Sequence, residues 1–250
     1  MAIMDIALPL AGTMAFWLGI LNIGEKAGVV QWISRIVGPF FSRLFPDIPR
    51  DHAAHGQMMM NFSANMLGLD NAATPFGLQA MSSLQACNPS KDVASNAQIM
   101  LLVLLTSGLT ILPISIIAQR AVLGAQDPTD IFIPTFIATY IATLVGIALV
   151  AVKQRINLWN RVMLTWLVGF PAALGARVLM IDTMQSLGAD SLAGRLASIF
   201  QGTTDTTFYI IALYFGSVGI KNVRYAITLG LLADLAGALA AIGVTYLFFN

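Results

Sequence analysis

The chain has 250 residues, of which 57% are hydrophobic and only 10% are charged. Soluble globular proteins carry about 25% charged residues, so 25 charged side chains cannot cover this much apolar area in water. Thirteen basic against twelve acidic residues leave no basic footprint for a nucleic acid, and one cysteine allows no internal disulfide. The composition therefore predicts an integral membrane protein whose first partner is the lipid bilayer.

The first apolar stretch predicts a retained membrane helix and not a cleaved secretory signal. A signal peptide has basic residues ahead of its apolar core, whereas here Asp5 precedes the core and Lys26 is the first basic residue. The segment Glu25–Phe45 follows, with apolar residues at helical spacing on one side. Two interpretations of it stay open: an amphipathic helix in the membrane interface, or an ordinary helix packed on its own bundle.

Helical membrane spans account for most of the remaining chain. A span takes about 20 residues, and the stretches long enough are Ile6–Ile23, Ile99–Ala118, Ile131–Val152 and Tyr225–Phe249. The shorter runs Val162–Leu174 and Thr206–Ile220 fit core helices, half-spans or re-entrant pieces. Because the period-2 alternation of strands is missing, we expect an all-α, polytopic helical bundle.

One polar stretch interrupts the apolar chain at residues 58–76. Asn61 and Asn65 are four residues apart and so share a helix face. Gly68 suits a helix C-terminus, and Thr74 followed by Pro75 suits the start of the next helix. This pattern predicts non-helical backbone at about Leu69–Ala73, with Asp70 and Asn71 in the break.

A second interruption follows Phe200. Gly202 again suits a helix end, and the hydroxyl and acidic residues after it suit a new helix start, so we expect non-helical backbone at about Gln201–Thr203. In a bilayer, broken backbone is tolerated only where protein buries it or where it lines a wet cavity. Two broken, re-entrant-like helices in pseudo-repeated halves therefore indicate a transport site between repeats. In the repeat, Asn96–Gly108 aligns with Thr204–Gly216 at an offset of 108.

The candidate substrate-binding residues are the polar side chains at the two breaks. They are Asn61, Asn65, Asp70, Asn71, Thr74, Gln201, Thr204, Asp205 and Thr206. A charged group at membrane depth costs about 3 kcal/mol, so such acids usually have a task, and we expect Asp70 and Asp205 to approach one another. The structural alternatives stay open: acids that cap helices or form ion pairs, and amides that join helices.

Asp234 lies in the middle of an apolar span and is either a coupling acid that exchanges a proton or a bundle contact. His52 and His55 are three residues apart, but no further ligand stands at metal spacing, so a surface role is favoured and no metal site is expected. No phosphate-binding loop, dinucleotide turn, nucleophile elbow or zinc-protease motif occurs. We expect no cofactor and no enzymatic activity.

Several longer motifs resemble the spore maturation protein A family. They are Gly24–Gly28, Arg35–Pro46, Asn61–Pro75 and Thr106–Thr110. The C-terminal part is similar to spore maturation protein B in Gly188–Ser191, Gly194–Ser198, Gln201–Tyr209, Tyr214–Lys221 and Gly230–Gly237. Both families carry the nucleoside-recognition, or gate, domain, which they share with nucleoside transporters and with the membrane part of the bacterial ferrous-iron transporter.

The resemblance implies two domains in a shortened form of the fused A/B protein. Residues 1–160 are the A-like gate domain, with an interfacial helix at 25–45, a broken helix at 53–86 and spans at 99–118 and 131–152. Residues 161–250 are the C-terminal part of the B-like gate domain, with a broken helix at 190–220 and a span at 225–249. Relative to the fused form, a first span and a segment between about Arg161 and Pro171 are missing.

The leading hypothesis is a multi-pass protein of the bacterial inner membrane that moves a small polar solute or ion, with nucleoside-like solutes included. The alternative is a membrane scaffold or regulator of the cell envelope or of spore maturation. A homo-oligomer is compatible with either hypothesis.

Overall fold

The computed structural model describes residues 23, 27–28, 41, 43–49, 51–68, 70–155, 173–203 and 207–249, without the side chains of 70–72, 155 and 173–178. In these residues the chain forms helices and no strand, apart from one isolated bridge between Val93 and Asn222. The helices are α3 (Ala53–Met66), α4 (Asp70–Ala86), α5 (Asn96–Thr106), α6 (Ile114–Val122), α7 (Phe132–Arg155), α8 (Ala173–Leu187), α9 (Leu192–Thr203), α10 (Thr207–Ser217) and α11 (Ala226–Phe249). The all-α prediction is confirmed for this part of the chain.

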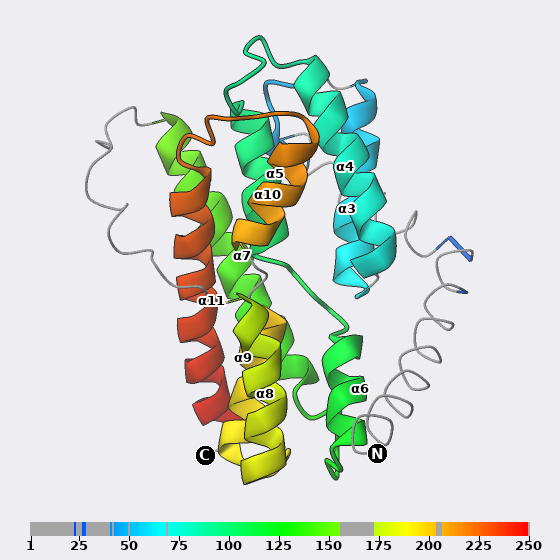
Figure 1. Ribbon diagram of the computed structural model, residues 1–250, viewed down its shortest axis with the longest axis vertical. Helices are drawn as coiled ribbons and strands as arrows, with labels where there is room; N and C mark the ends of the chain where they lie inside the picture. The colour runs from blue at the N-terminus through cyan, green and yellow to red at the C-terminus, as the bar shows by residue number, and fades with distance from the viewer. Residues whose placement is uncertain are drawn as a thin grey trace.

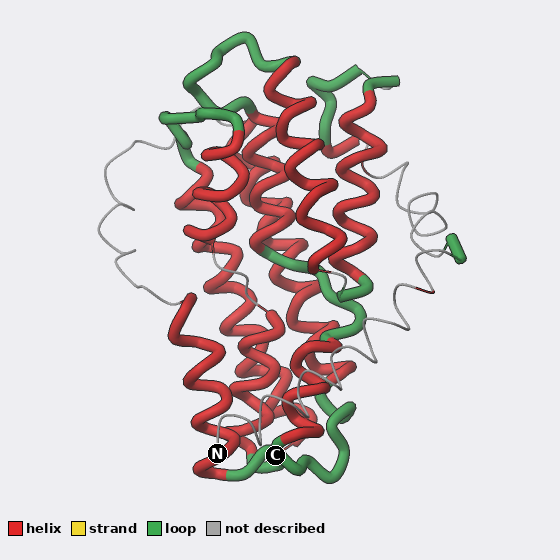
Figure 2. The backbone as a smooth tube through the Cα atoms, turned by 45° about the vertical axis from the view of Figure 1, so that its right-hand side comes forward, coloured by secondary structure: helices red, strands yellow, loops and turns green. Residues whose placement is uncertain are grey.

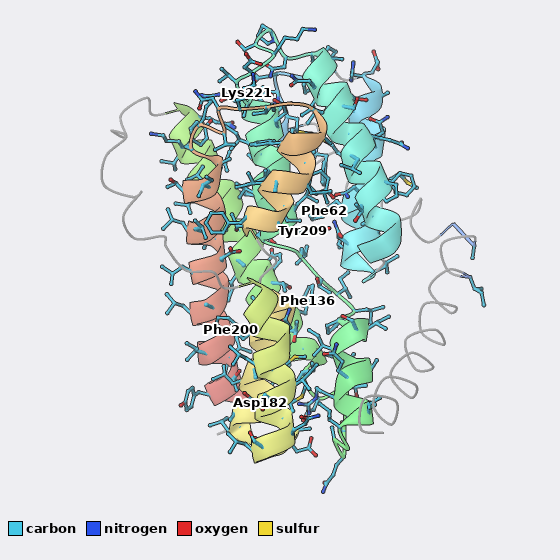
Figure 3. The ribbon with its side chains drawn as sticks, in the orientation of Figure 1. Phe62, Phe136, Asp182, Phe200, Tyr209 and Lys221 are labelled. Carbon is cyan, nitrogen blue, oxygen red and sulfur yellow. The ribbon has the colours of Figure 1, made fainter. Side chains whose placement is uncertain are left out.

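The described helices run along the long axis of the molecule, and most connections lie at its two ends (Figure 1). Lys221 marks one end and Asp182 the other (Figure 3). The two long helices α7 and α11 lie side by side over most of this length. Shorter helices flank them, with α5 and α10 toward the Lys221 end and α6, α8 and α9 toward the Asp182 end.

Two sets of three helices have opposite directions. The chain runs through α5 and α6 from the Lys221 end to the Asp182 end and returns through α7, whereas it runs through α9 and α10 the other way and returns through α11 (Figure 1). Both α7 and α11 have 24 residues and begin 94 positions apart, at Phe132 and Ala226. The repeat therefore pairs α5 with α9 and α6 with α10, which differs from the predicted offset of 108 that laid α5 over α10.

Small residues let α7 and α11 approach closely. An ideal Cβ on Gly146 of α7 would lie 3.3 Å from the Cβ of Ala233, and one on Gly237 of α11 would lie 3.2 Å from the Cβ of Ala142. Each helix thus places two small residues four positions apart against the other. This arrangement is common where helices pack without a hydrophobic driving force, because it brings the backbones into van der Waals contact.

Two apolar helices have the length and composition to cross a membrane, Phe132–Gln154 and Ala226–Phe249. They correspond to the predicted spans Ile131–Val152 and Tyr225–Phe249. The predicted span Ile99–Ala118 is wrong as one continuous helix, because α5 ends at Thr106 and α6 begins at Ile114. Figure 2 shows the loop between them in the middle of the molecule. The predicted span Ile6–Ile23 and most of Val162–Leu174 lie outside the described residues.

Neither predicted break lies at the predicted residues. Residues 70–73 are helical, and α3 ends at Met66 with Gly68 at φ +69°, so the turn is shorter and earlier than expected. Thr74 and Pro75 lie inside α4 and do not start it. Residues 201–203 are the last residues of α9, so the predicted gap there is also wrong. The helices α3 and α4 form a hairpin with antiparallel arms (Figure 1).

Most of Glu25–Phe45 lies outside the described residues, but its end is informative. Phe41 and Phe45 are fully buried, and the Phe41 ring lies 5.1 Å from the ring of Phe62 on α3. This end of the segment packs on α3, and the position of the rest of the segment stays a prediction. The main core joins α3, α4, α5 and α10, and α5 is buried on all sides because it lies between the other helices.

Candidate functional site

The end of α5 and the start of α10 meet the long helices α7 and α11 about halfway along the long axis of the molecule (Figure 1). The last residue of α5 is Thr106, and the first residue of α10 is Thr207. An ideal Cβ on Gly230 of α11 would lie 3.1 Å from the hydroxyl oxygen of Thr207 and 3.6 Å from that of Thr106. The end of α5 and the start of α10 therefore converge on one position of α11, and they can do so because that position has no side chain.

Asp234 is one turn further along α11 and joins this region. The hydroxyl of Thr207 donates a hydrogen bond of 2.5 Å to Oδ2 of Asp234. Acids at the amino end of a helix are stabilised by the partial positive charge of the helix dipole, and Thr207 is that end of α10. The sequence-predicted coupling residue thus lies where two helix ends meet.

Threonines of α7 face the connection between α5 and α6. Thr143 donates to the carbonyl oxygen of Ser107 over 3.4 Å, and Thr139 lies 3.5 Å from that of Thr110. Thr106 and Ser107 are fully buried, and each hydroxyl donates to a carbonyl in the last turn of α5. We call Thr106, Ser107, Thr143, Thr207 and Asp234 the central site.

The end of α9 brings further polar atoms to the same height. Gly202 fits against Thr135 of α7, because an ideal Cβ would lie 2.9 Å from its methyl carbon. The hydroxyl of Thr135 and Oε1 of Gln201 are buried and have no hydrogen-bond partner among the described residues. Gln201 is therefore the one predicted binding residue near α10 whose side chain the structure describes.

The predicted asparagines Asn61 and Asn65 lie on the α3–α4 hairpin. Asn61 is fully buried and donates 2.6 Å to the carbonyl of Ala73 on α4, and Asn65 donates to Asn61 over 3.4 Å. Gly77 of α4 fits against Asn61 and Tyr214. An ideal Cβ on Gly77 would lie 2.7 Å from Nδ2 of Asn61 and 2.6 Å from the hydroxyl oxygen of Tyr214. In this structure Asn61 joins α3 to α4, as the structural alternative expects, whereas Asn65 bonds within α3, and half-buried Thr74 lies on the same hairpin.

The hairpin turn packs against the α5–α6 connection. The carbonyl of Met66 accepts from the backbone N–H of Ile111 at 2.8 Å and of Leu112 at 3.4 Å. An ideal Cβ on Gly68 would lie 2.4 Å from the carbonyl oxygen of Leu112, so only glycine allows this approach. The turn and the connection therefore form one contact, and the predicted hairpin residues reach the central region through backbone.

The side chains of five predicted binding residues lie outside the described part of the chain. Thr204, Asp205 and Thr206 lie outside the described residues, as do the side chains of Asp70 and Asn71. The expected approach of Asp70 to Asp205 stays a prediction. The described backbone places Asp70 at the first position of α4, directly after the hairpin turn.

Sequence reasoning missed a charged cluster at the Asp182 end. Arg120, in the last turn of α6, is fully buried and pairs with Asp130 at 2.9 Å and with Asp190 at 3.1 Å. Arg195 of α9 pairs with Asp130 at 2.7 Å. We call Arg120, Asp130, Asp190 and Arg195 the ionic cluster; it joins the α6–α7 loop to the α8–α9 turn. In that loop, hydrogen bonds from Thr129 lower the pKa of Asp127.

An amide-rich cluster occupies the Lys221 end. Oδ1 of Asn96 accepts from the guanidinium of Arg224 at 3.0 Å and from the hydroxyl of Tyr225 at 2.8 Å. Gln98 is fully buried, completes the capping box with Ser95 and donates to Gln85 at 2.8 Å. We call Gln85, Asn88, Asn96 and Gln98, with Arg224 and Tyr225, the amide cluster.

The histidines have local structural contacts. Nδ1 of His52 accepts from the backbone N–H of Ala54 at the start of α3, and its Nε2 lies 3.3 Å from the sulfur of Cys87. His55 lies 3.4 Å from the carbonyl oxygen of Ile48. In the described part of the chain, no three histidine, cysteine or acidic side chains are grouped to hold a metal ion.

Comparisons with known proteins match both parts of the chain. A family model described as Gate, nucleoside recognition, matches residues 7–122. Spore maturation protein A of Bacillus subtilis (strain 168) is 42% identical over 137 residues, which are 55% of this chain and 70% of that protein. Spore maturation protein B of the same strain is 50% identical over 79 residues, which are 32% of this chain and 43% of that protein. No solved structure matches.

Proposed function

The chain belongs to the spore maturation protein A family, and from that premise we propose that it is a multi-pass protein of the bacterial inner membrane that moves a small polar solute or ion through its central site. The B-like part covers less than half of the relative it matches. Any activity of this part is therefore also a proposal. No enzymatic role is proposed.

The surfaces of the long helices support a membrane location. On α11, Leu239 is 61% exposed and Leu247 is 79% exposed, and on α7, Leu144 is 47% exposed. Hydrocarbon tails would cover such side chains at no cost, whereas water would not. The charged residues of the two clusters lie next to the ends of these helices, where the headgroups and water would meet them. Asp130 and Arg224 come just before α7 and α11, and the Arg195 guanidinium lies 4.7 Å from the ring of Phe249 at the end of α11.

The inverted helix order supports a transport role. Transporter folds commonly contain repeats of opposite direction, with the site near mid-membrane at helices that stop and restart. Here α5 and α6 are separated by residues 107–113, and α9 and α10 by residues 204–206. We interpret α5 and α6 as one broken membrane helix that supplies a helix end to the central site, and we propose the same for α9 and α10, whose connection lies outside the described residues. Non-helical backbone at that depth is tolerated where protein or a wet cavity surrounds it.

The single observation that carries the proposal is the bond between Thr207 and Asp234. A carboxylate on an apolar helix is costly in a bilayer and marks a solute or ion path in most cases. The hydroxyl of Thr207 contacts it, and the neighbouring helices bring the hydroxyl groups of Thr106, Ser107 and Thr143 to the same region, which suits a solute rich in hydrogen-bond donors or a cation. The family description makes nucleosides the first solutes to test, and Phe208 and Tyr209, at the start of α10, are exposed aromatic rings able to stack on a base.

The rival function is a membrane scaffold or regulator of the cell envelope. The bonds of Asn61 and Asn65 within the hairpin favour it, because these amides already have protein partners. Under this alternative, Asp234 and Thr207 join α10 to α11 and nothing passes between them. The two functions differ in whether removal of the Asp234 charge affects movement of a solute.

The test is uptake into liposomes that contain the purified full chain. We expect Asp234→Asn, which keeps the side-chain volume, to lower uptake of a radiolabelled nucleoside or of a competing small solute at least 10-fold. Thr245→Val is the matched control, because Thr245 is a buried α11 residue whose hydroxyl bonds its own helix at Ala241. A folded wild-type protein with no uptake of any screened solute, or an Asp234→Asn variant with full uptake, would support the scaffold.

A further inference from the structure

We propose that the central site binds a monovalent cation of the sodium class, held by Asp234 together with the oxygens at the end of α5 and on α7. The inference rests on the proposed function for its purpose, because a bound cation would couple solute movement to an ion gradient. Cation binding itself needs no solute, so the two can fail separately.

The first argument is that residues of α5, α7 and α10 lie against residues 230–234 of α11. Thr106 and Thr207 flank Gly230 at 3.6 Å and 3.1 Å from the position of a Cβ. Thr207 bonds Asp234 at 2.5 Å. On the α7 side, the backbone at Gly146 lies against Ser107 and against Ala233, the residue before Asp234. An ideal Cβ on Gly146 would lie 3.8 Å from the Cβ of Ser107.

The second argument concerns the protons of the hydroxyl groups. Each donates its single proton to an acceptor already named: Thr106 to Val103, Thr143 to Ser107 and Thr207 to Asp234. A hydroxyl has one proton and two lone pairs, so these oxygens have only lone pairs to offer to anything else. Such a group accepts and coordinates, and it does not donate.

The third argument is electrostatic. The carboxyl end of α5 carries a partial negative charge because the carbonyls of its last turn lack the N–H groups of a following turn. Asp234, the one acidic residue of α11, adds a carboxyl group in contact with Thr207, the first residue of α10. By sequence, α5, α10 and α11 contain no lysine or arginine, and the only basic residues of α7 are at its C-terminal end, at positions 153 and 155. The helices that form the site therefore favour a cation.

The ligand set also indicates the charge of the ion. One carboxylate with neutral hydroxyl and carbonyl oxygens balances a single positive charge. A calcium site usually takes six to eight oxygens with several carboxylates, and magnesium prefers carboxylates, phosphates and water. Unwound backbone carbonyls and helix carboxyl ends are the groups that coordinate sodium or protons in transporters with discontinuous helices.

The test is direct binding of ²²Na⁺ to the purified full chain in lipid nanodiscs, without solute. We expect saturable binding that unlabelled sodium chloride displaces and that choline chloride or magnesium chloride at equal ionic strength does not. Asp234→Asn should weaken binding at least 10-fold. Thr143→Val and Thr207→Val should each weaken it several-fold, and Thr207→Ser should retain it because the hydroxyl remains. Thr245→Val should bind as the wild type does.

A second measurement covers variants that fold poorly. Sodium should raise the thermal unfolding temperature of the wild type above its value in choline chloride, and this shift should vanish in Asp234→Asn. No saturable binding to the folded wild type, or equal binding by Asp234→Asn, overturns the inference. If sodium binds but no solute is taken up, the transport proposal fails and the site remains. If Asp234→Asn loses uptake and the wild type binds no sodium, the sodium site fails and the transport proposal stands, with proton coupling as the explanation.

Discussion

The two ends of the molecule join the same two sets of helices by different chemistry. At the Asp182 end, a fully buried arginine pairs with two carboxylates from different loops. At the Lys221 end, the cross-contacts are an asparagine that accepts from Arg224 and Tyr225 and backbone bonds from Lys221 and Asn222 to Asp92. The Asp182 end is held by ion pairs to a buried arginine, and the Lys221 end is held by neutral hydrogen-bond acceptors at the surface.

The difference predicts unequal resistance to opening. A buried charge that loses its partner costs about 3–5 kcal/mol, because it keeps its desolvation penalty without compensation. A neutral hydrogen bond near water contributes only about 0.5–1.5 kcal/mol, since water can replace the lost partner. We therefore expect the helices to separate first at the amide cluster and to stay together longest at the ionic cluster.

The largest effect should come from the centre of the ionic cluster. Arg120→Met keeps much of the side-chain length but removes the guanidinium that Asp130 and Asp190 share, so we expect a loss of about 3–5 kcal/mol in unfolding free energy. The measurement is denaturant or thermal unfolding of the purified protein in detergent. Arg195→Met is the matched control: Arg195 is 25% exposed in its side chain, so its removal should cost clearly less. Equal losses would mean that burial does not distinguish the two arginines.

A smaller effect is expected at the opposite end. Asn96→Ala removes the acceptor for both Arg224 and Tyr225 and should destabilise the protein by about 1 kcal/mol, because both donors can turn to water. Hydrogen exchange of the backbone amides near Asp92 and Asn222 should rise in the variant while amides near Asp190 keep their protection. Increased exchange at both ends would show that the two clusters open together and not separately.

The smallest effect has the opposite sign. Asn96→Asp gives the amide cluster a carboxylate that faces Arg224 and lies at the amino end of α5, so we expect a gain of about 0.5 kcal/mol at neutral pH. The gain should shrink in high salt, which screens exposed pairs. Unfolding in low and high salt measures it. A destabilised variant would indicate that Asn96 needs its side-chain NH2 group, because its backbone carbonyl, which accepts from Gln154 at 3.2 Å, is unchanged by the substitution.

The long helices could be predicted from sequence and the short ones could not. Residues 131–152 and 225–249 are unbroken apolar runs, and the helices formed there begin within one residue of the predicted positions. The run at residues 99–118 is just as apolar, but Ser107, Gly108 and Pro113 divide it into α5 and α6. Average hydropathy conceals three residues among 20, whereas the signals that stop and restart a helix are local.

Glycine and proline signals predict helix ends only in part. Gly202 predicts a helix end, and α9 ends one residue later at Thr203, where the missing side chain of Gly202 also makes room for Thr135 of α7. Thr74 and Pro75 suggested a helix start, but α4 begins four residues earlier, after the turn at Gly68. A sequence shows that a glycine or proline is present, and only the packed neighbours show whether it serves backbone conformation or close approach.

The candidate site was predicted in part. Asp234 was singled out because one acid in an apolar span is unusual, and its bond to Thr207 agrees with that choice. The buried role of Arg120 could not be inferred, since its partners are 10 and 70 residues away and meet it only through the fold. Similarly, Thr139 and Thr143 look like ordinary residues of an apolar helix until the α5–α6 connection is placed against them.

The crossing of α7 and α11 has a consequence for how such sequences can diverge. Gly146 opposes Ala233, and Gly237 opposes Ala142, at separations that leave no room for another methyl group. A side chain that grows on one helix can be accommodated only if its opposite number shrinks. Across species, the two positions of each pair should therefore change in concert, and the distance between the helix axes should be inherited more faithfully than the identity of the residues that set it.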